Sequence, residues 1–156
     1  MSPSRDGPAG SREEPWPSFR VLCVDDHRDC AHSFALLLRA MGFEARACYD
    51  APSALRLSDG FRPAVCFLDL NMPGMAGDEL ARRLRESGAW RPLLIVGVTA
   101  MSNEACRARV EAAGFDLHLV KPVDPGKLVE VVDLLFRAAE AARPSAARQR
   151  SGDVRP

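Results

Sequence analysis

The sequence lacks a long hydrophobic run, an excess of either charge, and an apolar stretch near its N-terminus. Its longest mostly apolar segment, Leu93–Val98, is far shorter than the roughly 20 residues that a membrane-spanning helix needs. Residues 2–8 are polar residues, glycine and proline where a secretory signal would be apolar, so we predict a soluble, cytoplasmic protein without a membrane partner. Lys plus Arg and Asp plus Glu number 21 each, and this zero net charge disfavours a nucleic-acid partner.

The cysteines lack the C-x-x-C spacing that is typical of a metal site. They are Cys23, Cys30, Cys48, Cys66 and Cys106, and two of them lie within apolar runs. We interpret all five as buried thiols, because the paired spacing of zinc ligands is absent. A disulfide framework is not expected in a reducing compartment for a chain of 156 residues.

Short apolar runs alternate with helix-length segments in the middle of the chain. Residues 1–18 and 142–156 are rich in Pro, Ser, Gly, Ala and Arg, so we predict a disordered N-terminal tail and a disordered basic C-terminal tail. Between them we predict one domain over residues 19–141. The strand candidates are residues 21–24, 44–48, 64–68, 93–98 and 117–120.

The segments between these strands have the apolar spacing of helices and the residues that commonly begin and end helices. Apolar residues recur at helical spacing at Cys30, Phe34, Leu37, Leu38 and Met41, and again at Leu128, Val131, Val132, Leu135 and Ala139. Glycines at the expected helix exits are Gly42, Gly60, Gly88 and Gly114. Candidates for the N-cap are Asp50, Ser102 and Asp124, with Pro125 at a first helical position.

The pattern predicts an α/β fold with a doubly wound, five-stranded parallel sheet. The first, third and fourth strands are apolar on both faces, which is typical of central parallel strands, whereas residues 44–48 alternate like an edge strand. An edge position for the second strand suits the flavodoxin-like order 2-1-3-4-5. In that order the first and third strands are neighbours, and ligands bind beyond their carboxyl ends.

Polar residues stand at the carboxyl ends of the predicted strands. They are Asp25 and Asp26 after the first strand, Asp69 after the third, Thr99 after the fourth and Lys121 after the fifth. Three carboxylates that meet at adjacent strand ends repel one another unless a cation lies among them, and hard oxygen ligands suit Mg²⁺. A lysine and a hydroxyl beside a metal suit a tetrahedral anion. We therefore predict phosphoryl-transfer chemistry.

Each of these residues also has an ordinary structural interpretation when it is taken alone. Asp25 and Asp26 suit the N-cap of the following helix. Thr99 suits a loop hydroxyl, and Lys121 suits a solvated strand end. Their combination at adjacent strand ends favours the phosphate site, with capping as an additional role of the two aspartates.

The chain resembles a response-regulator receiver domain of two-component signalling, of the CheY-like type, over roughly residues 19–140. The residues that carry the resemblance lie on four separate strand ends. They are Val24-Asp25-Asp26, Leu68-Asp69-Leu70-Asn71-Met72-Pro73-Gly74 with Gly77, Val98-Thr99-Ala100 and Val120-Lys121-Pro122.

The resemblance implies a role for each matching residue. Asp69 would accept a phosphoryl group from a phosphohistidine on a histidine kinase or a histidine phosphotransfer protein. Mg²⁺ would be held by Asp25, Asp26, Asp69 and the backbone carbonyl of Asn71. Thr99 and Lys121 would bind the phosphoryl oxygens, and a cis peptide is expected before Pro122.

The leading hypothesis is a signalling phosphoacceptor without an attached output domain, which is not an enzyme and acts on an unknown downstream protein. The alternatives are a receiver from a hybrid histidine kinase and a shuttle to a histidine phosphotransfer protein. An aspartyl-phosphate phosphatase is less favoured, because Asn71 stands where the haloacid-dehalogenase pattern has a second Asp. A DNA-binding regulator is disfavoured by the zero net charge and the lack of a helix-turn-helix segment.

His118 occupies the position, three residues before Lys121, where most receivers carry Tyr or Phe. Strand alternation points it away from Leu117 and Leu119, toward the outer face near the fourth helix. Two hypotheses stay open. Either His118 moves inward with Thr99 as a second switch residue, or it is a solvent-facing histidine with no such role.

Overall fold

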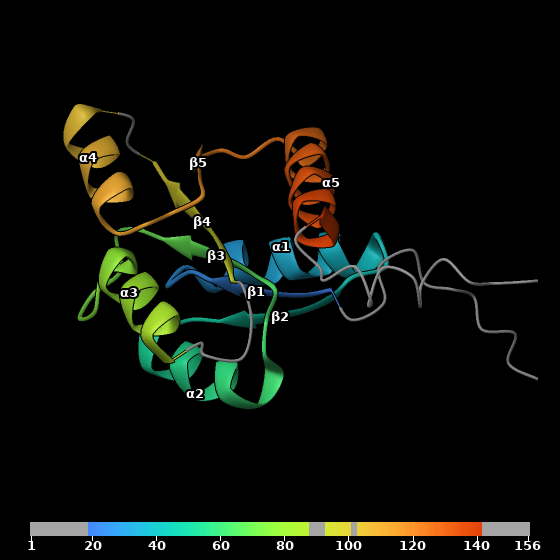
Figure 1. The fold of residues 1–156 in the computed structure, drawn as a ribbon, viewed down its shortest axis with the longest axis horizontal. Helices are drawn as coiled ribbons and strands as arrows, with labels where there is room; N and C mark the ends of the chain where they lie inside the picture. Colours follow the sequence, from blue (N-terminus) through green and yellow to red (C-terminus); the bar gives the residue numbers. More distant parts are fainter. Residues whose placement is uncertain (1–18, 88–92, 101–102, 142–156) are drawn as a thin grey trace, which may run out of the picture.

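A computed structural model describes residues 19–87, 93–100 and 103–141 (Figure 1). Strands and helices alternate through these residues. In chain order they are β1 (Arg20–Val24), α1 (Arg28–Ala40), β2 (Glu44–Cys48), α2 (Ala51–Phe61), β3 (Val65–Asp69), α3 (Gly77–Ser87), β4 (Leu94–Thr99), α4 (Glu104–Ala112), β5 (Leu117–Val120) and α5 (Pro125–Ala141). None of the helices in the described ranges is long and apolar enough to cross a membrane.

The five strands form one parallel sheet in the order β2-β1-β3-β4-β5, which confirms the predicted fold class. β2 pairs with β1 alone and is an edge strand, as its alternating pattern predicted. In the register between β3 and β4, Asp69 lies opposite Val98. The carboxyl ends of β1, β3 and β4 therefore meet at one edge of the sheet.

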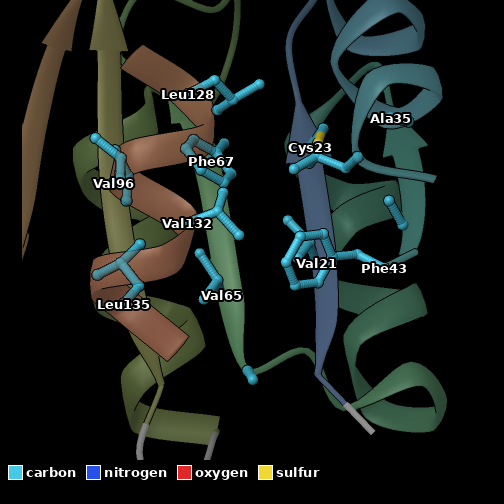
Figure 2. Close-up of a cluster of buried hydrophobic side chains, with 14 of the residues drawn as sticks. Val21, Cys23, Ala35, Phe43, Val65, Phe67, Val96, Leu128, Val132 and Leu135 are labelled. Carbon is cyan, nitrogen blue, oxygen red and sulfur yellow. The ribbon is translucent and has the colours of Figure 1, made fainter. Parts of the chain in front are cut away.

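Helices cover both faces of the sheet, and each face has its own hydrophobic core. On one face, α1 and α5 pack on β1, β3 and β4, and Figure 2 shows Leu128, Val132 and Leu135 of α5 against Phe67 and Val96. On the other face, α2 and α3 pack on Leu22, Cys66, Leu68 and Ile95. α4 contributes Cys106 and Val110 to a smaller cluster around Leu70.

The buried face of α1 agrees with the predicted stripe at Leu38 and differs from it in the first two turns of the helix. Ala31, Ala35 and Leu38 are fully buried against the sheet, whereas Cys30 is exposed, so the prediction that all five cysteines are buried is wrong for Cys30. The alanines are small enough to lie directly on the strands, and this rotates the larger residues, such as Phe34, to the margin of the interface. The predicted stripe of α5 is confirmed at Leu128, Val131, Val132 and Leu135.

Most of the predicted capping residues in the described ranges lie at helix ends. Oδ1 of Asp50 accepts a hydrogen bond from the backbone N–H of Ser53 at 2.7 Å, so Asp50 is the N-cap of α2. The N-cap of α4 is Asn103, and the predicted cap Ser102 lies outside the described residues, as does Gly88. The prediction for Gly60 is wrong, because α2 continues past it.

Residues with a left-handed backbone conformation follow the C-terminal ends of several helices. Gly42 and Gly114 have φ angles of 99° and 76°, as predicted, whereas the C-cap residue of α2 is Arg62, with φ 51°. The predicted tails at 1–18 and 142–156 lie outside the described residues and stay predictions.

Candidate functional site

The polar residues predicted at the strand ends lie together at the carboxyl edge of the sheet. Asp69 and Thr99 are the last residues of β3 and β4, and Lys121 directly follows β5. Asp25 and Asp26 follow β1, which is the neighbour of β3. The topology therefore brings together residues that are up to 96 positions apart in the sequence, as in the contact between Asp25 and Lys121.

Three carboxylates form the centre of this cluster. One oxygen each of Asp25, Asp26 and Asp69 lies within 4.8 Å of the other two. Asp25 and Asp69 are each 6% exposed, and Oδ1 of Asp26 is buried without a hydrogen-bond partner. Buried carboxylates that lack enough donors are costly unless a cation compensates them. The oxygen-only donor set and the unpartnered Asp26 atom fit a hard divalent cation.

Lys121 supplies a fixed positive charge at the edge of the acidic cluster. Its Nζ lies 2.6 Å from Oδ2 of Asp25 and 3.7 Å from Oδ2 of Asp69. Burial alone would lower the pKa of Lys121, but the hydrogen bond to Asp25 and the charges of Asp69 and Asp25 outweigh it and raise that pKa. Lys121 is therefore a permanent cation in the physiological pH range.

The carboxyl group of Asp69 holds its proton more strongly than an ordinary aspartate. Burial raises its pKa to about 6, against the opposing effects of a hydrogen bond from the Asn71 backbone N–H at 3.1 Å and of the Lys121 charge. The nearby charge of Asp25 adds to the increase. Asp69 is thus poorly solvated as an anion, and it gains from any cation that approaches it.

The loop after Asp69 turns tightly into α3. Gly77, the first residue of α3, donates its backbone N–H to the carbonyl of Leu70 at 3.2 Å. A Cβ atom on Gly77 would overlap the backbone carbonyl of Asp69, so the close approach of α3 requires glycine there. This glycine fixes the path of the backbone that carries Asn71.

A hydrogen-bonded chain that the sequence did not reveal lies beside the cluster. Nδ2 of Asn71 donates to Oγ1 of Thr99 at 3.3 Å, and Oδ1 of Asn71 accepts from Nη1 of Arg109 at 3.5 Å. Arg109 also forms an ion pair with Asp78 at the start of α3. No sequence motif marks Arg109 or Asp78, because both lie on helices whose orientation appears only in the folded structure.

His118 faces α4, as strand alternation predicted. It is partly buried, and its Nε2 lies 3.8 Å from Sγ of Cys106 on α4. Burial, together with the charge of Arg107, lowers the pKa of His118 below its ordinary value. The ring is therefore neutral at physiological pH. The peptide bond between Lys121 and Pro122 is cis, as the resemblance implied.

Comparison with known proteins identifies the family of this fold and cluster. The model of the response regulator receiver domain matches residues 21–133. The chain belongs to this family. The receiver domain is 35% identical over 120 residues to the transcriptional regulatory protein TctD of Salmonella typhimurium, covering 77% of this chain and 51% of TctD. It is 36% identical over 128 residues to the transcriptional regulatory protein PrrA of Mycobacterium leprae, covering 82% of this chain and 54% of PrrA.

Solved receiver structures share the fold. The chemotaxis protein CheY4 of Vibrio cholerae superposes with a TM-score of 0.70 and 27% identity, over 74% of this chain and 97% of CheY4. A two-component response regulator with a GGDEF domain superposes with a TM-score of 0.72, over 79% of this chain and 51% of that protein. The receiver chain thus spans almost all of CheY4 but only about half the length of the curated relatives that it matches.

Proposed function

We propose that this receiver domain accepts a phosphoryl group on Asp69 from a phosphohistidine, as one step of a two-component phosphorelay. The observation that carries the proposal is the surroundings of Asp69. Its buried carboxyl group lies between two other carboxylates and a permanently charged lysine, with Lys121 Nζ 3.7 Å away. A carboxylate in that setting is a nucleophile beside the cations that phosphoryl transfer requires.

In this proposal Mg²⁺ is held by Asp25, Asp26, Asp69 and the backbone carbonyl of Asn71. When it is bound, it neutralises the negative charge of the carboxylates and of the incoming phosphoryl oxygens. The unpartnered Oδ1 of Asp26 and the mutual distance of the three carboxylates support this assignment. Lys121 supplies the second positive charge, 2.6 Å from Asp25 and 3.7 Å from Asp69.

The transfer step uses the side chains of the strand ends. An oxygen of Asp69 attacks the phosphorus atom, a P–O bond forms, the P–N bond to the donor histidine breaks, and its electron pair stays on the imidazole nitrogen. Lys121 binds a phosphoryl oxygen, and the Thr99 hydroxyl donates a hydrogen bond to another. The product is an acyl phosphate, which adds about 1.5 to 2 negative charges at this point. That charge draws Thr99 toward Asp69 and shifts the chain after β4.

A groove beside the acids offers a place for the phosphate donor. It has a volume of about 560 Å³ and lies between α1 and the chain after β5. Phe34, Pro122 and Val123 contribute to its mostly apolar lining, and Asp25 and Lys121 also line it. We assign this groove to the helix of the partner kinase or phosphotransfer protein that carries the phosphohistidine, because an apolar wall next to the acceptor aligns the donor ring.

The site supports signalling rather than turnover of a free substrate. A phosphatase of the aspartyl-phosphate type needs an acid or base two residues after the nucleophile, and that position is Asn71, whose amide is engaged by Thr99 and Arg109. We therefore propose that phosphorylation of Asp69 switches the binding of a downstream protein.

Incubation with a small acyl phosphate and Mg²⁺ tests the proposed function. We expect the mass of the intact protein to increase by one phosphoryl group, because the acids and Lys121 need no kinase to position a small donor. Removal of divalent cations by a chelator should abolish this labelling, since Asp69 would then face the phosphoryl oxygens without sufficient positive charge. Labelling that is absent in both conditions, or equal in both, contradicts the proposal.

The pH dependence of the response tests His118 as a second switch residue. If the ring moves inward when Thr99 moves, the change from His118 to Tyr should strengthen binding of the phosphoryl mimic beryllofluoride about two- to fivefold, because more apolar area becomes buried. The lowered pKa of His118 favours the neutral ring, and protonation below that pKa opposes inward burial. Acid should therefore weaken the response of the wild type more than that of His118→Tyr.

Backbone amide spectra with and without beryllofluoride, at pH 5.5 and 7.5, provide the measurement for His118. Because both proteins keep Asp69, its own titration affects them equally, and the difference between them reports on residue 118. Identical shifts near Thr99 and α4 in both proteins at both pH values would assign His118 no part in the switch.

A further inference from the structure

The side chain of Arg109 crosses from α4 to α3 and to the loop after Asp69. Its Nε and Nη2 donate to the two carboxylate oxygens of Asp78, at 3.2 and 3.1 Å. Its Nη1 donates to Oδ1 of Asn71 at 3.5 Å. A guanidinium group that is bound through two bonds to one carboxylate has a fixed plane. Asp78 therefore determines where the third donor of Arg109 points.

The orientation of the Asn71 amide follows from this contact. A guanidinium group has donors and no acceptor, so the amide oxygen of Asn71 must face Arg109. The Nδ2 end of the same amide then faces β4 and donates to Oγ1 of Thr99 at 3.3 Å. Without Arg109, nothing in the described contacts of the Asn71 side chain would decide between the two orientations of the amide.

The contacts from Asp78 through Arg109 and Asn71 end at Thr99. In the proposed function Thr99 is the residue that the phosphoryl group attracts. Thr99 is fully buried, and its hydroxyl oxygen accepts a hydrogen bond from the Asn71 amide. In the proposed function this oxygen moves toward a phosphoryl group on Asp69, and a hydrogen bond from an amide of fixed orientation restrains that movement. The contact therefore holds Thr99 in the position that the structure shows.

We propose that Arg109 is a positioning residue: held in place by Asp78, it turns the Asn71 amide toward Thr99 and so restrains the movement of the Thr99 hydroxyl toward Asp69. The inference rests on the proposed function, and it adds a direct connection from α4 to the site. Both hydrogen bonds of the Asn71 side chain are long. Their loss should therefore change the affinity for a phosphoryl mimic by about two- to tenfold rather than by orders of magnitude.

Binding of beryllofluoride in the presence of Mg²⁺ tests the proposal. We expect Arg109→Met to bind this mimic about two- to tenfold more tightly than the wild type, because Thr99 no longer has to leave an oriented amide. The matched control is Arg82→Met, which removes the same charge from an exposed position of α3. Equal affinity of Arg109→Met and wild type would overturn the proposal, as would an equal gain in Arg82→Met, since charge alone would then explain it.

A second variant separates positioning through Asn71 from a general loosening of α4. Asn71→Ala removes the amide and keeps the backbone carbonyl. In an Asn71→Ala background, the further change Arg109→Met should leave beryllofluoride affinity unchanged. A further gain of the same size as in the wild-type background would show that Arg109 acts by another route and would overturn the proposal.

A measurement without metal or phosphoryl mimic completes the test. In the metal-free protein, the side-chain amide resonances of Asn71 and the backbone amide of Thr99 should shift in Arg109→Met and stay unchanged in Arg82→Met. Unchanged resonances in Arg109→Met would contradict the proposed orientation of the amide. A wild-type protein that does not bind beryllofluoride contradicts the proposed function instead, so the two failures are distinguishable.

Discussion

Asp69→Asn is expected to abolish labelling by a small acyl phosphate, while the wild type gains one phosphoryl group. An amide has no anionic oxygen to attack phosphorus, and Asp69 is the acid of the cluster that ends the central strand β3. Asp25 is engaged at both oxygens, by the His27 backbone N–H at 2.9 Å and by Lys121 at 2.6 Å. Mass measurement of the intact protein, followed by mapping of the labelled peptide, checks the result.

A matched exposed aspartate controls for the loss of a carboxylate. Asp59 lies on the surface of α2, so Asp59→Asn should be labelled to the same extent as the wild type. Labelling of Asp69→Asn at full yield would assign the acceptor to another residue. Loss of labelling in Asp59→Asn would show that the effect of Asp69→Asn is not specific to the site.

The fold was predictable because strand and helix patterns in this chain are simple and mutually consistent. β1, β3 and β4 are nearly continuous apolar runs, as expected for strands with helices on both faces. The alternating pattern of β2 placed it at the edge, and that position determined the strand order. The consistency of these local patterns explains why the topology followed from one sequence.

The errors in the predicted fold concern details that depend on how closely helices and strands approach one another. Ala31 and Ala35 form the buried face of α1, but alanine contributes little to an apolar pattern, so the stripe was assigned one position away, at Cys30 and Phe34. Arg62 closes α2 in the left-handed region, where a glycine is the usual residue. Sequence preference identified Gly60 instead.

The candidate site was predictable only as far as strand topology determines it. The rule that ligands bind at the carboxyl ends of parallel strands was sufficient to place Asp25, Asp69 and Lys121 together. Arg109 and Asn71 are 38 residues apart, and their contact depends on the rotation of α4 about its axis. Sequence periodicity does not predict which exposed side chain of a helix reaches a neighbouring loop.

Metal binding should respond in opposite directions to the loss of an acid and of the lysine. Asp26→Ala removes a carboxylate from the cluster and is expected to weaken Mg²⁺ binding on the order of a hundredfold, because a unit charge a few ångströms from a divalent cation contributes several kcal/mol. Lys121→Met removes a cation that lies 2.6 Å from Asp25, so Mg²⁺ should bind at least as tightly as in the wild type. Isothermal titration of metal-free protein with Mg²⁺ provides both values.

Lys127 provides the matched control for the lysine. It lies on the exposed surface of α5, 3.9 Å from Glu130, and Lys127→Met should leave Mg²⁺ affinity unchanged. Equal weakening in Asp26→Ala and Lys121→Met would contradict the assigned positions of the metal and the lysine. Tighter binding in Lys127→Met to the extent seen in Lys121→Met would indicate an effect of net charge alone.

The same titration has a predictable pH dependence that reports on Asp69. With its pKa raised to about 6, Asp69 is increasingly protonated below pH 6, and the proton must leave before the carboxylate can bind Mg²⁺. Wild-type affinity should therefore be constant above about pH 7 and fall as the pH decreases through 6, by up to about tenfold per pH unit. Near pH 6 the measured heat should depend on the ionisation enthalpy of the buffer, because binding releases protons. An affinity that is constant from pH 7.5 to 5 would show that Asp69 is not a ligand whose proton competes with the metal, and would leave Asp25, Asp26 and the Asn71 carbonyl as the ligands.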